Sequence, residues 1–388
     1  MASAGGAKSS LAQGIALLLV AVVSGIAQSA LSPILPKIAE HFAAEPNADV
    51  LVRLLVTSVI FAMIAGSVGG GYLAQRLGQR RVLLAALAGF TLCGTAGYFL
   101  DNLSALLVSR LALGVFTAAA GTIAVAVITT ELSEERDRWL GFYLMVGTFS
   151  AVGILLAVGI IGSYDWRAVF LLHLIAVPIG LMIAYTLPNS PPPAAKAREK
   201  SGFELPIAGL VFALAVGALS AASTTFVPFV LKEIGEGDPQ RVAGALLPTA
   251  IGGGLAGFAY GWLRKYVGVA GAFVIGFMAA LIGLLIIVST PIYSLILVGM
   301  FFLGIAIGTL GPNVLSAAAG AVPPERRTNA MGLIRAASYS GPLVSQIGLE
   351  PINSWRGPAA ALLTLGAMSL VMVLLSVGLR RNLTPRYA

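Results

Sequence analysis

The sequence predicts an all-α membrane protein of twelve transmembrane helices, arranged as two pseudo-symmetric halves of six helices each. Three observations lead to this fold class: an apolar composition, twelve apolar runs of spanning length, and matching residues about 190 positions apart. Apolar residues make up 58% of the 388 residues and charged residues only 10%, whereas a soluble domain carries about 45–50% apolar and about 25% charged residues. This composition excludes a soluble globular protein and also a disordered chain, which needs low hydrophobicity and high charge.

The apolar runs are each near the roughly 20 residues that a membrane-spanning helix needs. The first six lie at 13–36, 50–74, 81–100, 104–129, 139–162 and 166–187. The second six lie at 204–231, 239–263, 267–289, 291–319, 329–349 and 355–379. Lipid offers no hydrogen bonds to the backbone, so each run is expected to be helical.

A polar stretch at 188–203, PNSPPPAAKAREKSGF, separates the two sets of runs. Proline and charge make it unsuited to cross lipid, so we interpret it as a linker. The predicted domains are an N-terminal six-helix bundle at 1–187, a cytoplasmic linker at 188–203 and a C-terminal six-helix bundle at 204–388.

Lysine and arginine fall unevenly on the two sides of the predicted membrane. With a cytoplasmic N-terminus, 16 of the 24 lie inside and 6 outside, and the remaining two, Arg110 and Arg335, lie within predicted helices. This bias predicts that both termini are cytoplasmic, and we expect a bacterial cytoplasmic (inner) membrane. It also accounts for the net charge of +8, so nucleic-acid binding is rejected.

The two halves repeat each other in order. At a shift of 190, Gly114 matches Gly304, and Glu135-Arg136 matches Glu325-Arg326. The same shift aligns two more pairs of glycines: Gly71 with Gly261, and Gly78 with Gly268. Two parallel six-helix repeats are typical of transporters whose site lies between the repeats.

Several motifs carry a family resemblance. Residues 71–81, GYLAQRLGQRR, resemble the signature loop between the second and third helices of the major facilitator superfamily. Residues 110–114, RLALG, resemble the Arg-x-x-Gln-Gly motif of its fourth helix, and residues 165–170, DWRAVF, and 31–36, LSPILP, resemble its drug-exporter branch. Gln75 replaces the signature aspartate, Leu113 replaces the glutamine, and the fifth predicted helix lacks the Gly-Pro of the antiporter motif.

This resemblance implies a secondary transporter that moves a small organic solute by alternating access, with efflux as the expected direction. It also implies that the loop latches the two halves in the outward-facing state. The latch residues are Gly71, Gln75, Arg76, Gly78 and Arg80. The alternative is a loop that only supplies positive charge to the inner face.

Polar residues within predicted helices are candidates for a substrate cavity. Arg110 is costly in lipid and is expected to face the bundle interior or a wet cavity, the alternative being a side chain that snorkels to the surface. The other candidates are Gln28, Thr224, Asn313, Arg335 and Tyr339. The resemblance places the first three on cavity-lining helices, and the last two lie in the eleventh predicted helix. Serine and threonine in such helices usually bond to their own backbone instead.

No acidic residue lies near the centre of a predicted helix. His173 is the only group there that titrates near neutrality, which makes it a candidate proton carrier, and its alternative is a neutral histidine bonded within the bundle. Otherwise coupling would use an end carboxylate, such as Glu131 or Glu350, or charge on the substrate. The lack of central carboxylates disfavours a cationic drug, and Arg110 favours an organic-anion carrier driven by membrane potential or exchange.

Enzyme chemistry has little support in the sequence. There is a single cysteine, Cys93, and only two histidines, so we expect no metal site, and no phosphate-binding loop is present. The richest charged cluster, Glu131 to Arg138, repeats in part in the second half and is better interpreted as a loop. We therefore expect no cofactor and no enzyme activity, a membrane-embedded enzyme being the alternative class. The expected partners are a small-molecule substrate, the lipid bilayer and protons, and the expected state is a monomer.

Overall fold

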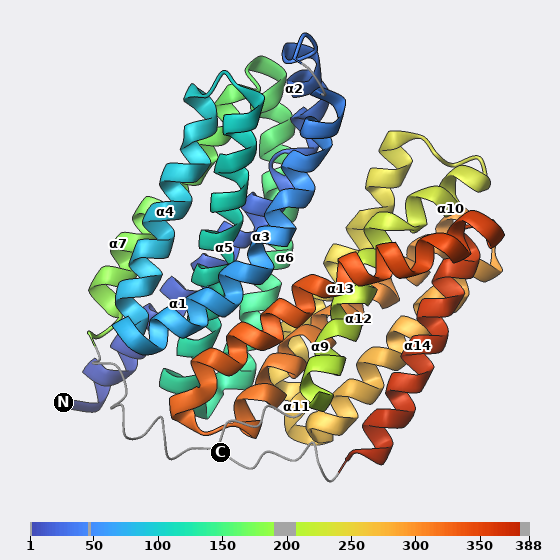
Figure 1. Cartoon of the computed structure of the whole chain (residues 1–388). Helices are drawn as coiled ribbons and strands as arrows, with labels where there is room; N and C mark the ends of the chain where they lie inside the picture. The colour runs from blue at the N-terminus through green and yellow to red at the C-terminus, as the bar shows by residue number, and fades with distance from the viewer. Residues whose placement is uncertain (1, 46–47, 190–206, 381–388) are drawn as a thin grey trace. The chain divides into compact units, whose positions relative to one another are not determined.

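The computed structural model describes residues 2–45, 48–189 and 207–380 of the chain, and all regular structure in these ranges is helical (Figure 1). From residue 190 onward, the predicted linker lies outside the described residues. The first-half elements are α1 (Ala2–Ser29), η1 (Ser32–Ile34), α2 (Leu35–His41), α3 (Ala48–Leu77), α4 (Gln79–Phe99), α5 (Leu103–Glu131), η2 (Ser133–Glu135), α6 (Arg136–Tyr164), η3 (Arg167–Ile175) and α7 (Ala176–Thr186). The second-half elements are α9 (Ile207–Thr225), α10 (Val227–Glu233), α11 (Pro239–Ser289), α12 (Tyr293–Ala321), η4 (Pro324–Arg326), α13 (Arg327–Arg356) and α14 (Pro358–Gly378).

These elements confirm the predicted all-α fold class. Within the described ranges, nine helices are long and apolar enough to cross a membrane. One of the nine, α11, contains two predicted runs, because Gly268 breaks it with a φ of 68°. The two remaining runs are α9, whose apolar part is shorter, and α13, which is more polar than the others.

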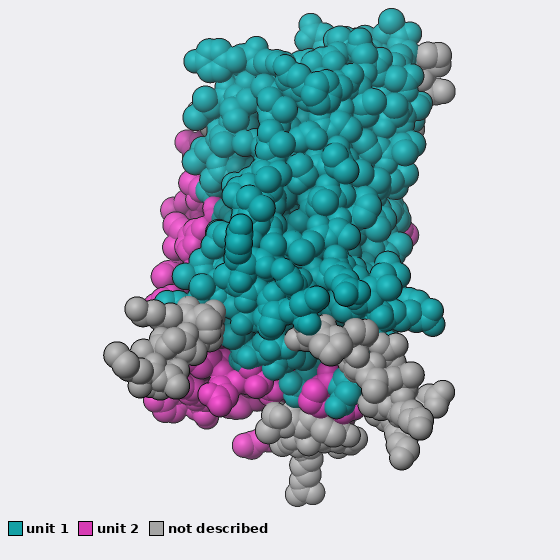
Figure 2. Space-filling model, turned by 90° about the vertical axis from the view of Figure 1, so that its left-hand side faces the viewer, with its two compact units in different colours: residues 1–132, 150–202, 325–336 teal, residues 133–149, 203–324, 337–388 magenta. Residues whose placement is uncertain are grey.

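The chain forms two compact units that do not simply follow the order of the sequence. Unit 1 contains residues 1–132, 150–202 and 325–336, and unit 2 contains residues 133–149, 203–324 and 337–388 (Figure 2). Two helices, α6 and α13, are therefore each divided between the units. The first turns of α6 pack with second-half helices, and the first turns of α13 pack with first-half helices.

The predicted repeat has a direct structural counterpart in the contacts of two equivalent glycines. In unit 1, a Cβ on Gly114 of α5 would lie 2.4 Å from the carbonyl oxygen of Val59 in α3. In unit 2, a Cβ on Gly304 of α12 would lie 2.2 Å from the carbonyl oxygen of Thr249 in α11. Val59 and Thr249 are separated by the same shift as the two glycines, so each unit contains the same close backbone crossing.

We expect Gly304→Ala to lower the free energy of unfolding by about 1–3 kcal/mol, because the added methyl group forces the two backbones apart. The measurement is thermal unfolding of the purified protein in detergent. Gly69→Ala is the control, since nothing lies within 4 Å of a Cβ at Gly69, and it should be neutral or stabilising because alanine favours helix. Equal melting temperatures for the two variants would contradict the close crossing.

Candidate functional site

The first turn of α13 is held by first-half helices in unit 1. Gln75 near the end of α3 is buried, and its side-chain amide donates to the carbonyl oxygen of Glu325 at 2.9 Å. Gln79 at the start of α4 donates to the hydroxyl of Thr328 at 2.8 Å. In a third bond the donor is on α13 itself: Arg327 donates to the carbonyl oxygen of Thr129 in α5 at 2.8 Å. We call this set of residues, with Gly71 and Gly332, the α13 corner.

Two glycines allow the helices of the α13 corner to touch. A Cβ on Gly71 would lie 2.9 Å from the carbonyl oxygen of Thr328, and a Cβ on Gly332 would lie 2.6 Å from that of Ser67. The backbones of α3 and α13 are therefore in direct contact, which brings the polar groups of this corner within hydrogen-bonding distance.

The other predicted latch residues have different surroundings. Gly78 has a φ of 94° and forms the turn between α3 and α4, a conformation that suits glycine. Arg80 donates to the carbonyl oxygen of Ala184 at 2.6 Å, near the end of α7. Arg76 is exposed, and its guanidinium lies 4.3 Å from the centre of the Tyr72 ring. Of the five, only Gly71 and Gln75 have recorded contacts with the α13 corner.

The first turn of α6 enters unit 2 in an equivalent way. Ser316 of α12 donates to the carboxylate of Asp137, whose Oδ1 also lies 3.8 Å from the guanidinium of Arg264 in α11. Arg264 is buried and donates to Ser316, to Asn313 at 3.0 Å, and to Tyr260 at 2.7 Å. We call these five residues, with Gly141, Gly257 and Gly261, the α6 corner.

Glycine contacts make the two corners alike. A Cβ on Gly141 of α6 would lie 2.2 Å from the carbonyl oxygen of Gly257, and a Cβ on Gly261 would lie 2.7 Å from the Cα of Arg138. Gly261 is the repeat equivalent of Gly71, so both corners use a glycine at the same place. Sequence reasoning missed the charged cluster of the α6 corner, although Asp137 stands in the repeated Glu-Arg segment that could have pointed to it.

Arg110 lies inside unit 1 among α4, α5 and η3. It is 1% exposed, and its guanidinium donates to the carbonyl oxygens of Cys93 at 3.2 Å and Gly94 at 3.1 Å. The Phe170 ring lies over the same guanidinium, 4.9 Å away. In the described residues, the Arg110 cation is thus stabilised by carbonyl dipoles and an aromatic face.

His173 is packed beside Arg110 in the same interior. It is also 1% exposed, its Nδ1 lies 2.8 Å from the carbonyl oxygen of Phe170, and its ring is 5.0 Å from that of Phe90. A Cβ on Gly94 would lie 2.2 Å from the His173 ring, so the ring occupies the space that the glycine leaves open. Its Nε2 is buried and has no hydrogen-bond partner among the described atoms.

The other predicted cavity residues are dispersed. Gln28 is exposed and donates to the carbonyl oxygen of Ser24 in its own helix at 3.2 Å. Asn313 is fully buried in the α6 corner, where its amide nitrogen also donates to the carbonyl oxygen of Val269 at 3.0 Å. Arg335 and Tyr339 are half-buried on α13, and the side chain of Thr224 lies outside the described part of the chain.

A polar cluster occupies the opposite end of α4 in unit 1. Asp101, in the turn between α4 and α5, lies 2.8 Å from His41 Nε2 and 2.5 Å from the guanidinium of Arg167. Hydrogen bonding with His41 and with Arg167 lowers the pKa of the Asp101 carboxyl below its ordinary value. This cluster ties α2, the α4–α5 turn and η3 together.

The fold and the two corners define a multi-pass integral membrane protein built from an internal repeat. A family model described as Major Facilitator Superfamily matches residues 17–345. The chain belongs to the Major Facilitator Superfamily, which confirms the resemblance that its motifs indicated.

Curated relatives and solved structures agree with this family. The chain is 30% identical to the puromycin resistance protein pur8 of Streptomyces alboniger over 295 residues, which is 73% of this chain and 57% of that protein. It is 29% identical to the multidrug efflux pump LfrA of Mycolicibacterium smegmatis over 179 residues, which is 45% of this chain and 34% of that protein. These matches span about a third to three fifths of the relatives' lengths.

The fold is similar to that of the proton:xylose symporter XylE, with a TM-score of 0.76 at 16% identity and 95% of each chain covered. It is also similar to the human organic anion transporter MFSD10 (TETRAN), with a TM-score of 0.75 at 16% identity, covering 94% of this chain and 99% of that one.

We expect Ser316→Ala to lower the free energy of unfolding by about 1–3 kcal/mol, because it leaves the buried guanidinium of Arg264 and the partly buried carboxylate of Asp137 with fewer partners. Combining it with Asp137→Asn should show a coupling energy of about 0.5–3 kcal/mol in a double-mutant cycle. Ser369→Ala is the matched control, since that buried hydroxyl bonds only to Leu365 in its own helix. Strictly additive effects would show that the α6 corner does not act as one network.

Proposed function

We propose that the protein is a secondary active transporter that exports a small organic solute by alternating access. The observation that carries this proposal is the pair of equivalent corners, in which the start of α6 and the start of α13 are each bonded to helices of the other sequence half. Such a reciprocal arrangement gives the two halves a defined set of contacts to make and release. Release of these contacts is the discrete change that alternating access needs.

The bonds of the α13 corner are of a strength suited to switching. Its two side-chain amide bonds are neutral, and each contributes about 0.5–1.5 kcal/mol net, whereas the bond from the buried cation Arg327 to the Thr129 carbonyl contributes about 1.5–3 kcal/mol. A few such bonds bias a two-state equilibrium without locking it. The α6 corner contains a buried cation and a carboxylate, so we expect it to resist opening more strongly.

The relatives support export without deciding the substrate. One is named a multidrug efflux pump and another a puromycin resistance protein, whereas a further relative is named an arabinose-proton symporter, from Escherichia coli, 28% identical over 186 residues. Export rests on the drug-exporter resemblance of residues 165–170 and 31–36. The anion-carrier alternative has less support, because the recorded bonds of Arg110 go to backbone carbonyls.

The remaining parts of the proposal concern topology and coupling. We infer six-helix bundles at 1–187 and 204–388, cytoplasmic termini, and a monomer in the bacterial cytoplasmic membrane. Membership of a superfamily of transporters supports transport over the alternative of a membrane-embedded enzyme. The membrane potential alone can drive an anionic solute outward, since one charge crossing the membrane is worth about 2.3 kcal/mol per 100 mV, whereas export of a cationic solute needs exchange for another cation such as a proton.

The function is tested in two steps. A thermal-shift screen of the purified protein identifies a stabilising solute, and counterflow of that solute is then measured in proteoliposomes without a pH gradient. We expect counterflow in the wild type and in His173→Gln, because His173 is buried against Phe90 and Gly94. Absence of counterflow in the wild type would refute the transporter proposal, and its loss only in a folded His173→Gln would make His173 the proton carrier.

The latch yields a separate prediction on conformational opening. In a Cys93→Ser background, a cysteine replaces Ala330, a fully buried residue in the first turn of α13. We expect Gln75→Ala to increase its rate of modification by a water-soluble maleimide about two- to tenfold, since a net hydrogen-bond contribution of 0.5–1.5 kcal/mol is lost. Gln28→Ala is the control, because the Gln28 amide bonds only within its own helix. An unchanged rate in Gln75→Ala would remove Gln75 from the latch.

A further inference from the structure

Helix α13 differs in composition from the other long helices of the described chain. It is not among those apolar enough to count as a spanning helix by composition. Its second half carries Ser345, Gln346, Glu350, Asn353 and Ser354. Ser345 and Gln346 fall within the predicted run at 329–349, where a polar group faces protein or a water-filled cavity because exposure to lipid is costly. Glu350, Asn353 and Ser354 follow that run, toward the end of the helix.

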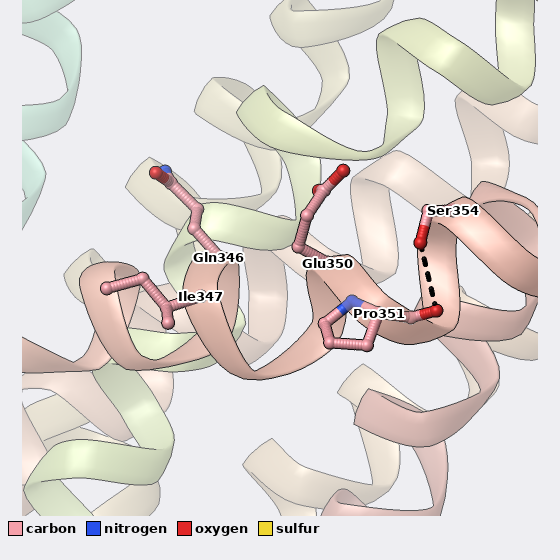
Figure 3. Close-up of a pocket in the computed structure, with 5 residues that line it drawn as sticks. All are labelled: Gln346, Ile347, Glu350, Pro351 and Ser354. Atoms are coloured by element: carbon pink, nitrogen blue, oxygen red, sulfur yellow. Dashed lines mark hydrogen bonds between the residues drawn. The ribbon is translucent and has the colours of Figure 1, made fainter.

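An open, shallow groove lies along this part of α13 within unit 2. Its lining residues are Gln346, Ile347, Glu350, Pro351 and Ser354. Figure 3 shows that Gln346 and Glu350, one helical turn apart, extend from the same side of the helix. The groove is open, and all five lining residues belong to α13, with Gln346 and Glu350 forming a polar rim beside the apolar Ile347 and Pro351.

Hydrogen-bond acceptors predominate on this rim. Pro351 has no N–H, so the carbonyl of Ile347 lacks its usual helical donor four residues on. The amide nitrogen of Gln346 donates to the hydroxyl of Thr225 in α9 at 3.1 Å, which directs the amide away from α13 and leaves its oxygen as an acceptor. Ser354 uses its hydroxyl proton on the carbonyl of Pro351 at 3.1 Å.

The carboxylate of Glu350 has no cation beside it in the described residues. Its recorded partner is the neutral amide of Asn353 at 3.3 Å, and no ion pair includes it among the described side chains, whereas Glu236 is paired with Arg241 at 3.0 Å. A ligand that supplies both positive charge and several N–H donors would complement this rim.

We propose that the α13 groove binds the protonated amine of the transported solute, with Glu350, the Gln346 oxygen and the Ile347 carbonyl as its acceptors. This inference rests on the proposed transport function and names a substrate class for it, an organic amine with an apolar body. Counting acids along the sequence disfavoured a cationic solute because no carboxylate is central in a helix. The groove supplies a carboxylate nearer the end of α13.

The experiment compares two fluorescent probes that differ only in charge and donors: dansylcadaverine, a primary amine, and its N-acetyl derivative. Binding to the full chain in lipid nanodiscs is followed by fluorescence. We expect Glu350→Gln to weaken dansylcadaverine binding roughly tenfold or more, as hydrogen bonds to a charged group predict, with no change for the acetylated probe. Glu40→Gln is the control, since it removes an exposed carboxylate on α2.

A second variant tests the proline. Pro351→Ala restores an N–H to the Ile347 carbonyl, so it should weaken binding of the amine severalfold and leave the acetylated probe unaffected. Size-exclusion profiles and melting temperatures confirm that the variants are folded. Equal amine binding by folded Glu350→Gln and wild type, or absence of amine binding by the wild type, would overturn the site. Solute counterflow is measured in a separate experiment. Absence of amine binding by the wild type with counterflow intact would refute the α13 groove alone, whereas absence of counterflow in the wild type would refute the transport function.

Discussion

The absence of hydrogen-bonding solvent in the lipid interior constrains every part of this structure. Each backbone N–H and C=O must be bonded within its own helix, and helices can then associate only through close packing and a few side-chain bonds. Gly114 and Gly304 meet this constraint by bringing backbones into contact. At the α13 corner, Arg327 donates to the carbonyl of Thr129 in the last turn of α5, where helical bonding leaves acceptors available.

The two corners repeat one geometry with different chemistry. Both place a glycine, Gly71 or Gly261, against the first turn of a helix from the other sequence half. The α13 corner then uses neutral amides and a cation on carbonyls, whereas the α6 corner buries Arg264 with a carboxylate. The repeat has therefore kept its backbone contacts while its side chains diverged, so the two corners differ in their resistance to opening.

Hydropathy was sufficient to predict the helices, and the repeat spacing was sufficient to predict that Gly114 and Gly304 occupy equivalent positions in the two halves. Both signals can be obtained from local segments of the sequence. The contacts of the candidate site were not predictable in this way. Arg327 and Thr129 are 198 residues apart, and an apolar run does not say which neighbour it meets. The partners of Arg110 are backbone carbonyls, which no motif encodes. The role of Pro351 depends on the helix continuing through it, which the residues alone do not show.

The division of α13 between the two units has a consequence for biosynthesis. Thr129 leaves the ribosome about 200 residues before Arg327, which corresponds to roughly 10–40 s at about 5–20 residues per second. During that interval the first six helices are in the membrane while their α13 corner has no occupant. Unit 1 is therefore completed only after residue 336 has been added, and premature termination anywhere before residue 325 would leave Gln75 and the Thr129 carbonyl exposed to quality control.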